Sequence, residues 1–199
     1  MIEFVPFFLF AIAASITPGP TNLIVLSQSV RYGILATLPV VLGGCAGAAL
    51  VVLTAGLGIG DALATHVTAR LWLQGAGIAW LTYLGWQLWR SPVDTAFEMR
   101  NDRARLGFLG AAALQLINPK AWMMALAVVA VFSHSDQPNM FELACLTGIF
   151  FATSLPCLAC WAMLGSAAKR WLNTPARRSA FNRTLAIMLL LSAWSTLIP

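Results

Sequence analysis

Lys120 is the residue of this sequence with the most chemical consequence, because it lies deep inside an apolar run, 107–133. It follows the start of that run by 13 residues, which puts it near the middle of a bilayer at about 1.5 Å of rise per residue. An ammonium group at that depth costs about 3 kcal/mol on insertion scales, so a function is the default interpretation. Three roles are open: binding a substrate carboxylate, exchanging a proton, or holding backbone carbonyls freed elsewhere. The alternative is a lysine at the edge of a misplaced span, whose ammonium snorkels to water.

Proline breaks interrupt two apolar runs that lie half a chain apart. Thr17-Pro18-Gly19-Pro20 falls within run 4–29, and Asn118-Pro119 immediately precedes Lys120. Pairing Pro18 with Pro119 aligns the two runs. Because proline lacks an N–H and clashes with the carbonyl four residues back, about one turn of helix should unwind at the first break. The freed backbone groups must then face protein or a wet cavity. The alternative is a plain proline kink, which membrane helices tolerate.

Polar side chains gather at both breaks, as a binding site requires. Gln115 and Asn118 are spaced i, i+3 and therefore share one face of a helix. A helix that resumes after a break presents free N–H groups and the positive end of its dipole, which suit the carboxylate of an amino acid. We predict one substrate site made by both breaks, with no catalytic residue, cofactor or metal. Its expected residues are Thr17, Pro18, Gly19, Pro20, Thr21, Asn22, Gln115, Asn118, Pro119 and Lys120.

The elements that must position these residues are membrane-spanning helices. The chain of 199 residues is 59 % hydrophobic and 10 % charged, whereas soluble domains carry about 25 % charged residues. We therefore predict an all-α integral membrane protein whose main solvent is the lipid bilayer. Its six expected spans, the first and fourth of them broken, are 4–29, 35–59, 69–89, 107–133, 141–167 and 180–198.

Basic residues predict the orientation of these spans. With both termini outside, the loops 1–2, 3–4 and 5–6 face the cytoplasm, and they hold ten of the twelve Lys and Arg residues. The outer side holds only Arg70, and Lys120 belongs to neither side. Such a bias is typical of cytoplasmic loops. The net charge of +5 is therefore interpreted as membrane topology, and no nucleic-acid partner is expected.

Six spans divide into three plus three, which inverts the second half relative to the first. We predict a single membrane transporter domain over 1–199, built as a 3+3 inverted repeat. Its halves are about 1–90 and 107–199, joined by a linker at about 91–106. Breaks at corresponding positions of such repeats are where transporters bind their substrates. None of the seven Asp and Glu residues is expected inside a span, so the residue that carries protons stays unassigned.

Other motifs leave rival functions open. Cys157-Leu-Ala-Cys160 is a C-x-x-C pair within the fifth span, which suggests a membrane thiol–disulfide electron carrier as the alternative. Such a carrier should have a cysteine in each break, and neither break contains one. A structural subunit without transport is the third option, and it leaves Lys120 unused. Gly43-x-x-x-Gly47 predicts close helix packing. Trp122 and Trp161 are interpreted as packing residues, with substrate stacking as the alternative. Because no nucleotide-binding motif occurs, a transporter of this kind must use an ion or substrate gradient.

Three stretches resemble the LysE/RhtB superfamily of bacterial amino-acid exporters. They are 15–22 (Ser-Ile-Thr-Pro-Gly-Pro-Thr-Asn), 76–86 (Ala-Gly-Ile-Ala-Trp-Leu-Thr-Tyr-Leu-Gly-Trp) and 114–120 (Leu-Gln-Leu-Ile-Asn-Pro-Lys). The resemblance covers essentially the whole chain and looks closest to the cysteine/O-acetylserine exporter branch. It implies a multi-pass protein of the bacterial inner membrane that exports small neutral amino acids or derivatives, such as cysteine, O-acetylserine, homoserine or threonine. It also implies coupling to protons by antiport, and a homodimer.

Overall fold

The computed structural model describes residues 4–90, 106–133 and 139–194, and every regular element within them is a helix. The predicted linker, apart from Leu106, and the last four residues of the sixth expected span lie outside the described residues. The helices are α1 (Phe4–Ile16), α2 (Pro20–Tyr32), α3 (Ile34–Thr54), the segment η1 (Ala55–Ile59) that kinks at Gly58, α4 (Gly60–Thr65), α5 (Val67–Trp89), α6 (Phe108–Ile117), α7 (Pro119–Phe132), α8 (Met140–Lys169) and α9 (Pro175–Trp194).

The first predicted break is confirmed between α1 and α2. Residues 17–19 are not helical, and the two helices meet at an angle of 55°. Gly19 is extended, with φ −160° and ψ 175°, and Pro20 opens α2. A proline is favoured at a helix start, because the N–H that it lacks has no partner there in any case.

The second break is confirmed between α6 and α7, which meet at 70°. Asn118 is extended between them, and Pro119 opens α7. Pro20 rather than Pro18 is therefore the counterpart of Pro119, and pairing Pro18 with Pro119 is wrong by two residues. The physical reason is that the proline at the start of each resumed helix fixes the correspondence, whereas Pro18 lies in the unwound segment.

Within the described residues, four stretches are apolar and long enough to cross a membrane, if each bent pair counts as one span. They are α1 with α2, α3 with η1, α6 with α7, and α8. The helices α5 and α9 are not among them. Arg70, Gln74 and Gln87 dilute α5, and Arg177, Arg178 and Arg183 dilute α9. The protein is thus an all-helical membrane protein, and the count of six spans stays a prediction.

The helices that carry the breaks pack around α3 and α8. The helix α3 lies against α6 and α8, and α8 also covers α1 and α2. A core of apolar residues from α1, α3, α7 and α8 includes Phe7, Val51, Val128 and Leu146. The packing role predicted for the glycines of α3 is confirmed, because a Cβ on Gly43 would lie 2.1 Å from the backbone oxygen of Phe108.

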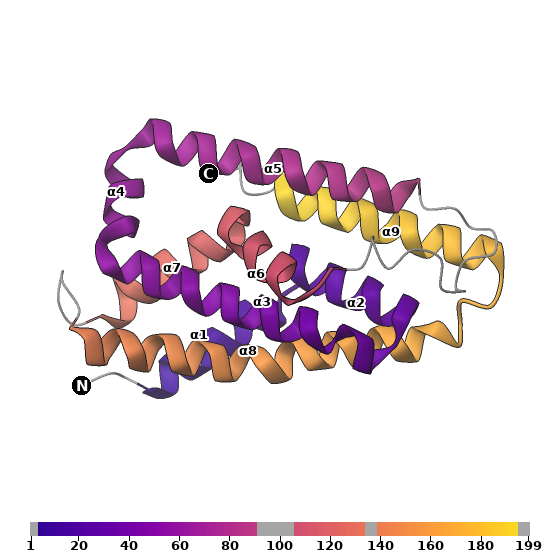
Figure 1. Cartoon of the computed structure of the whole chain (residues 1–199), viewed down its shortest axis with the longest axis horizontal. Coiled ribbons are helices and arrows are strands. Elements are labelled where there is room, and N and C mark those ends of the chain that lie inside the picture. Colours follow the sequence, from indigo (N-terminus) through magenta and orange to yellow (C-terminus); the bar gives the residue numbers. More distant parts are fainter. Residues whose placement is uncertain (1–3, 91–105, 134–138, 195–199) are drawn as a thin grey trace.

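The helices α5 and α9 pair along one side of the molecule (Figure 1). Leu81, Leu185 and Leu189 join this pair to Leu23 of α2. The guanidinium of Arg183 lies 5.5 Å from the ring centroid of Trp89, a cation–π contact that gives this charge a partner on α5. Figure 1 also places the α2–α3 junction, the C-terminal end of α5 and the α8–α9 connection at the same end of the molecule. Basic residues at these three connections therefore share one end.

Candidate functional site

Both helix breaks line one cavity of about 50 Å³ at the centre of the protein. The helices α3 and α8 complete its wall with Gly44, Phe150 and Ser154. A volume of this size is enough for ordered water. Seven of the ten residues predicted for a substrate site line it: Gly19, Pro20, Thr21, Asn22, Gln115, Asn118 and Lys120.

The ammonium of Lys120 reaches from one break to the other. Its Nζ donates to the carbonyl oxygens of Thr17 at 2.8 Å and Pro18 at 3.3 Å. Of the three roles left open by the sequence, holding freed carbonyls is therefore the one seen in this conformation. A Cβ on Gly19 would lie 3.0 Å from both Cδ and Nζ of Lys120. Glycine at position 19 thus leaves room for the ammonium to lie against the start of α2.

An amide network ties the two breaks to α3. Thr21 Oγ1 donates to Gln115 Oε1 at 3.0 Å, and Asn118 Nδ2 donates to the same oxygen at 2.9 Å. Gln115 Nε2 in turn donates to the carbonyl of Gly44 at 3.0 Å. Gln115 and Asn118 therefore meet, but the prediction that they share one face of a helix is wrong, because α6 ends at Ile117 and Asn118 is extended. All four residues lie in the cavity wall, so moving one break would disturb hydrogen bonds made by the other.

Side chains satisfy the carbonyls left free where α1 and α6 end. Asn22 Nδ2 donates to Ser15 O at 2.8 Å, and Trp161 Nε1 donates to Ile16 O at 3.1 Å. At the other break, Trp122 Nε1 donates to Leu116 O at 2.7 Å. Sequence reasoning gave both tryptophans a packing role, with substrate stacking as the alternative, and did not foresee these hydrogen bonds. Their indole N–H groups, which need a partner inside a membrane, were the signal that could have revealed this role.

The two resumed helices differ in how their first turns are satisfied. The side chain of Asn118 caps α7 by accepting from the backbone N–H of Lys120 at 3.2 Å. Gly19 has no side chain, and α2 has no side-chain cap. The first turn of a helix leaves N–H groups without an intrahelical partner and carries the positive end of the dipole. Beside the Lys120 ammonium, the start of α2 is therefore suited to an anion.

Three predicted residues do not line the cavity. The hydroxyl of Thr17 bonds back to Ala13 O, and Thr17 and Pro18 are exposed. Pro119 is buried beneath α5, because a Cβ on Gly77 would meet its Cδ at 3.0 Å. Thr17 and Pro18 contribute their backbone carbonyls to the site, where they accept from Lys120. Pro119 contributes by starting α7 immediately after the break.

Sequence reasoning missed two serines in the cavity wall. Ser15 and Ser154 are buried, and their hydroxyls are 3.1 Å apart. Both are small polar residues in apolar runs, which was the available signal.

The described residues contain no group of three His, Cys, Asp or Glu that could hold a metal. Glu142 is buried in the first turn of α8, contrary to the expectation of carboxylates outside the spans, but it does not line the cavity.

A comparison with known families decides what kind of protein carries this site. The chain matches the family described as LysE type translocator over residues 12–198. The chain belongs to the LysE-type translocator family. The resemblance seen in the motifs around both breaks is thereby confirmed. Members of this family are transporters, and the breaks, Lys120 and the cavity lie within the matched region of this LysE-type translocator.

Curated relatives of this LysE-type translocator are efflux proteins. A homoserine/homoserine lactone efflux protein of Salmonella typhimurium is 24 % identical over 180 residues, covering 89 % of this chain and 87 % of the relative. A cysteine/O-acetylserine efflux protein of Escherichia coli strain K12 is 25 % identical over 191 residues, covering 94 % and 93 %. No solved structure matches the chain.

Proposed function

We propose that this protein is a secondary carrier that exports small neutral amino acids or their derivatives from the cytoplasm. The observation that carries the proposal is the pairing of the Lys120 ammonium with the uncapped start of α2 in one cavity. A carboxylate bound there would meet a cation and free N–H donors together. The relatives named for homoserine, cysteine and O-acetylserine point to the same class of cargo.

The cavity wall also supports a small neutral cargo. Ser15 at the end of α1 and Ser154 of α8 place two hydroxyls in the wall, and hydroxyl oxygens can accept from the ammonium of an amino acid. Met124, Phe150 and Leu158 provide an apolar surface for a short side chain. No carboxylate occurs among the described residues of this wall, so a second positive charge on the cargo would have no partner. Basic amino acids are therefore disfavoured.

Substrate binding would change the bonds of Lys120. In this conformation the ammonium holds the carbonyls of Thr17 and Pro18. An arriving carboxylate would compete for the same protons and release the unwound segment between α1 and α2. Occupancy of the site would thereby be coupled to the shape of the first break, which is what alternating access requires.

An inverted repeat of three plus three spans gives these movements a framework. Matching packing supports the repeat, since α3 lies against α6 as α8 lies against α1. Likewise α2 lies against α8 as α7 lies against α3, and α5 pairs with its counterpart α9. Two similar halves around a shared site can rock against one another while the site stays in place.

We place the protein in the bacterial inner membrane with both termini outside. The end of the molecule that carries Arg31, Arg90 and Lys169 then faces the cytoplasm. Export is proposed to be coupled to protons, and Lys120 is the one ionisable side chain among the described residues of the cavity wall. The homodimer implied by the resemblance stays a prediction.

Efflux from proteoliposomes tests this function. Vesicles that contain the purified protein are loaded with labelled L-homoserine or O-acetyl-L-serine, and release is followed with and without an inward proton gradient. We expect release to require the protein and to accelerate with the gradient. Release equal to that of empty vesicles for both compounds would contradict the proposal.

The double variant Cys157→Ser/Cys160→Ser should export normally, because neither cysteine lines the cavity. Loss of export in this variant would instead favour the thiol–disulfide electron carrier.

Asn118→Ala should reduce both stability and export. It removes the cap of α7 and one donor to Gln115 Oε1, and losing a helix cap costs about 1 kcal/mol. Asn139 is a matched control, since it caps α8 by accepting from Glu142 N at 2.9 Å and does not line the cavity. We expect similar losses of thermal stability in Asn118→Ala and Asn139→Ala, with slower efflux only in the first. Equal efflux from both variants would show that Asn118 is not part of the transport site.

A further inference from the structure

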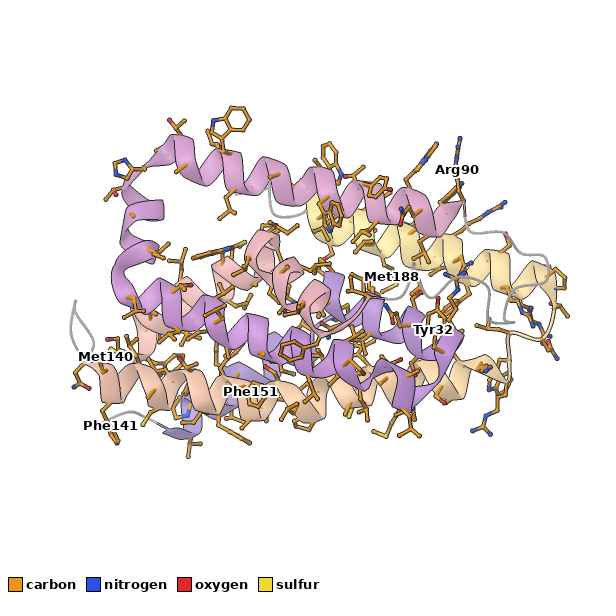
Figure 2. All side chains as sticks on the ribbon, in the orientation of Figure 1. Tyr32, Arg90, Met140, Phe141, Phe151 and Met188 are labelled. Carbon is orange, nitrogen blue, oxygen red and sulfur yellow. The ribbon has the colours of Figure 1, made fainter. Side chains whose placement is uncertain are left out.

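A second cavity lies between α2, α5 and α9, and it shares no residue with the central one. Its volume is about 150 Å³, against about 50 Å³ at the centre. It begins on α2 immediately after Asn22 and extends toward the end of the molecule where Figure 2 shows Tyr32 and Arg90. Its lining residues are Leu23, Ile24, Ser27, Gln28, Arg31, Tyr32, Leu84, Gln87, Leu88 and Leu189.

Gln28 lines this cavity and carries a buried acceptor that is unsatisfied. The residue is only 8 % exposed. Nε2 makes one long hydrogen bond, 3.5 Å to Leu106 O, whereas Oε1 is buried without any partner in the described part of the chain. A buried acceptor without a donor costs free energy, so such a group in a native structure calls for an explanation. A ligand in the cavity that donates hydrogen bonds would satisfy it once the side-chain amide turns toward the cavity.

Arg31 adds a cation one turn further along the same helix. Residues spaced i, i+3 lie about 5–6 Å apart between Cβ atoms, which suits the two ends of one small ligand. The guanidinium is exposed, lies 5.9 Å from the ring centroid of Tyr32, and has no carboxylate partner among the described residues. Leu84, Leu88 and Leu189 close the opposite wall with apolar surface. The cavity thus combines an anion-binding group, an acceptor and a hydrophobic wall.

We propose that this cavity binds a small amino acid as a zwitterion. The guanidinium of Arg31 takes the carboxylate, Gln28 Oε1 accepts from the ammonium, and the leucines contact the side chain. The inference rests on the proposed export function, because it makes this cavity a loading site on the cytoplasmic end of α2. A bound amino acid would then have to pass along α2 to reach the break at Gly19 and Pro20.

Counting bound ligand per protein tests the second site. The purified full-length protein is placed in nanodiscs of phosphatidylcholine, and binding of labelled L-homoserine is measured at equilibrium. We expect two equivalents for the parent. Lys120→Met should retain only the loading site, and Gln28→Leu/Arg31→Gln should retain only the central site. The equivalent that each variant keeps shows that it is folded. Arg31→Gln alone should weaken the loading site about tenfold or more, as expected for a lost charged hydrogen bond.

Arg90→Gln is the matched control for charge at the same end of the molecule. Arg90 stacks on Trp86 at 4.1 Å and does not line the cavity, so this variant should keep both equivalents. A parent that binds one equivalent, lost in Lys120→Met and kept in Gln28→Leu/Arg31→Gln, would overturn the loading site and leave the export function intact. No binding in any sample would overturn both. Loss of the second equivalent when phosphatidylglycerol is added would identify a lipid-headgroup site and overturn the amino-acid assignment.

Discussion

Lys120→Met should reduce efflux of labelled homoserine about 100-fold. Methionine keeps most of the length of lysine and removes the charge, so the carboxylate of the cargo loses its cation. A hydrogen bond to a charged group contributes about 1.5–3 kcal/mol, and about 3 kcal/mol corresponds to a factor of about 100. The carbonyls of Thr17 and Pro18 also lose their donor. The measurement is the initial rate of release from proteoliposomes with matched protein content.

Two further variants isolate the charge of Lys120 from its bulk. Lys120→Arg keeps the charge, but its planar guanidinium differs in shape from the compact ammonium against Gly19. We expect it to recover part of the activity. Lys169→Met removes a lysine at the end of α8, outside the cavity, and should transport normally. Parent-like efflux from Lys120→Met would remove Lys120 from the mechanism.

Gly43→Ala should destabilise the protein strongly for a change of one methyl group. The added Cβ would lie 2.1 Å from Phe108 O and 2.8 Å from Phe108 C, both backbone atoms that cannot rotate away. Overpacking of this kind costs about 1–3 kcal/mol. The neighbouring Gly44 supplies the carbonyl that Gln115 bonds, so separating α3 from α6 would also open the cavity wall. A lower unfolding temperature in detergent and slower efflux should appear together.

Gly148→Ala is the matched control for this substitution. Gly148 lies within α8, and a Cβ there would meet nothing within 4 Å. The same chemical change should therefore leave the unfolding temperature and efflux at parental values. Equal behaviour of Gly43→Ala and Gly148→Ala would contradict the close packing of α3 on α6.

The breaks and their polar residues could be predicted because their signals are local. Proline, glycine and lysine within an apolar run are conspicuous wherever the chain folds. The partners of Lys120 could not be predicted, because they lie more than 100 residues away and depend on how α1 and α7 approach. The alignment of Pro18 with Pro119 failed for a related reason. Two prolines stand close together at the first break, and only the fold tells which of them begins a helix.

Other parts of the site depend on packing that a single sequence does not reveal. Trp161 and Ser154 meet the first break from α8, and nothing in their own neighbourhood distinguishes them from packing residues. Gln28 lies near the end of an apolar run, where a polar residue is unremarkable. Its burial beside a cavity follows only from the way α5 and α9 cover α2.

The central claim is that the Lys120 ammonium binds the carboxylate of the cargo at the start of α2. The most direct measurement compares the binding of L-homoserine and its amide to the parent and to Lys120→Met, both carrying Gln28→Leu/Arg31→Gln so that only the central site is read. The two ligands share size, side chain and ammonium and differ in the carboxylate. We predict that the protein with Lys120 binds the acid about 10- to 100-fold more tightly than the amide. Lys120→Met should largely abolish this difference in affinity. An equal preference for the acid with and without the lysine would contradict the account.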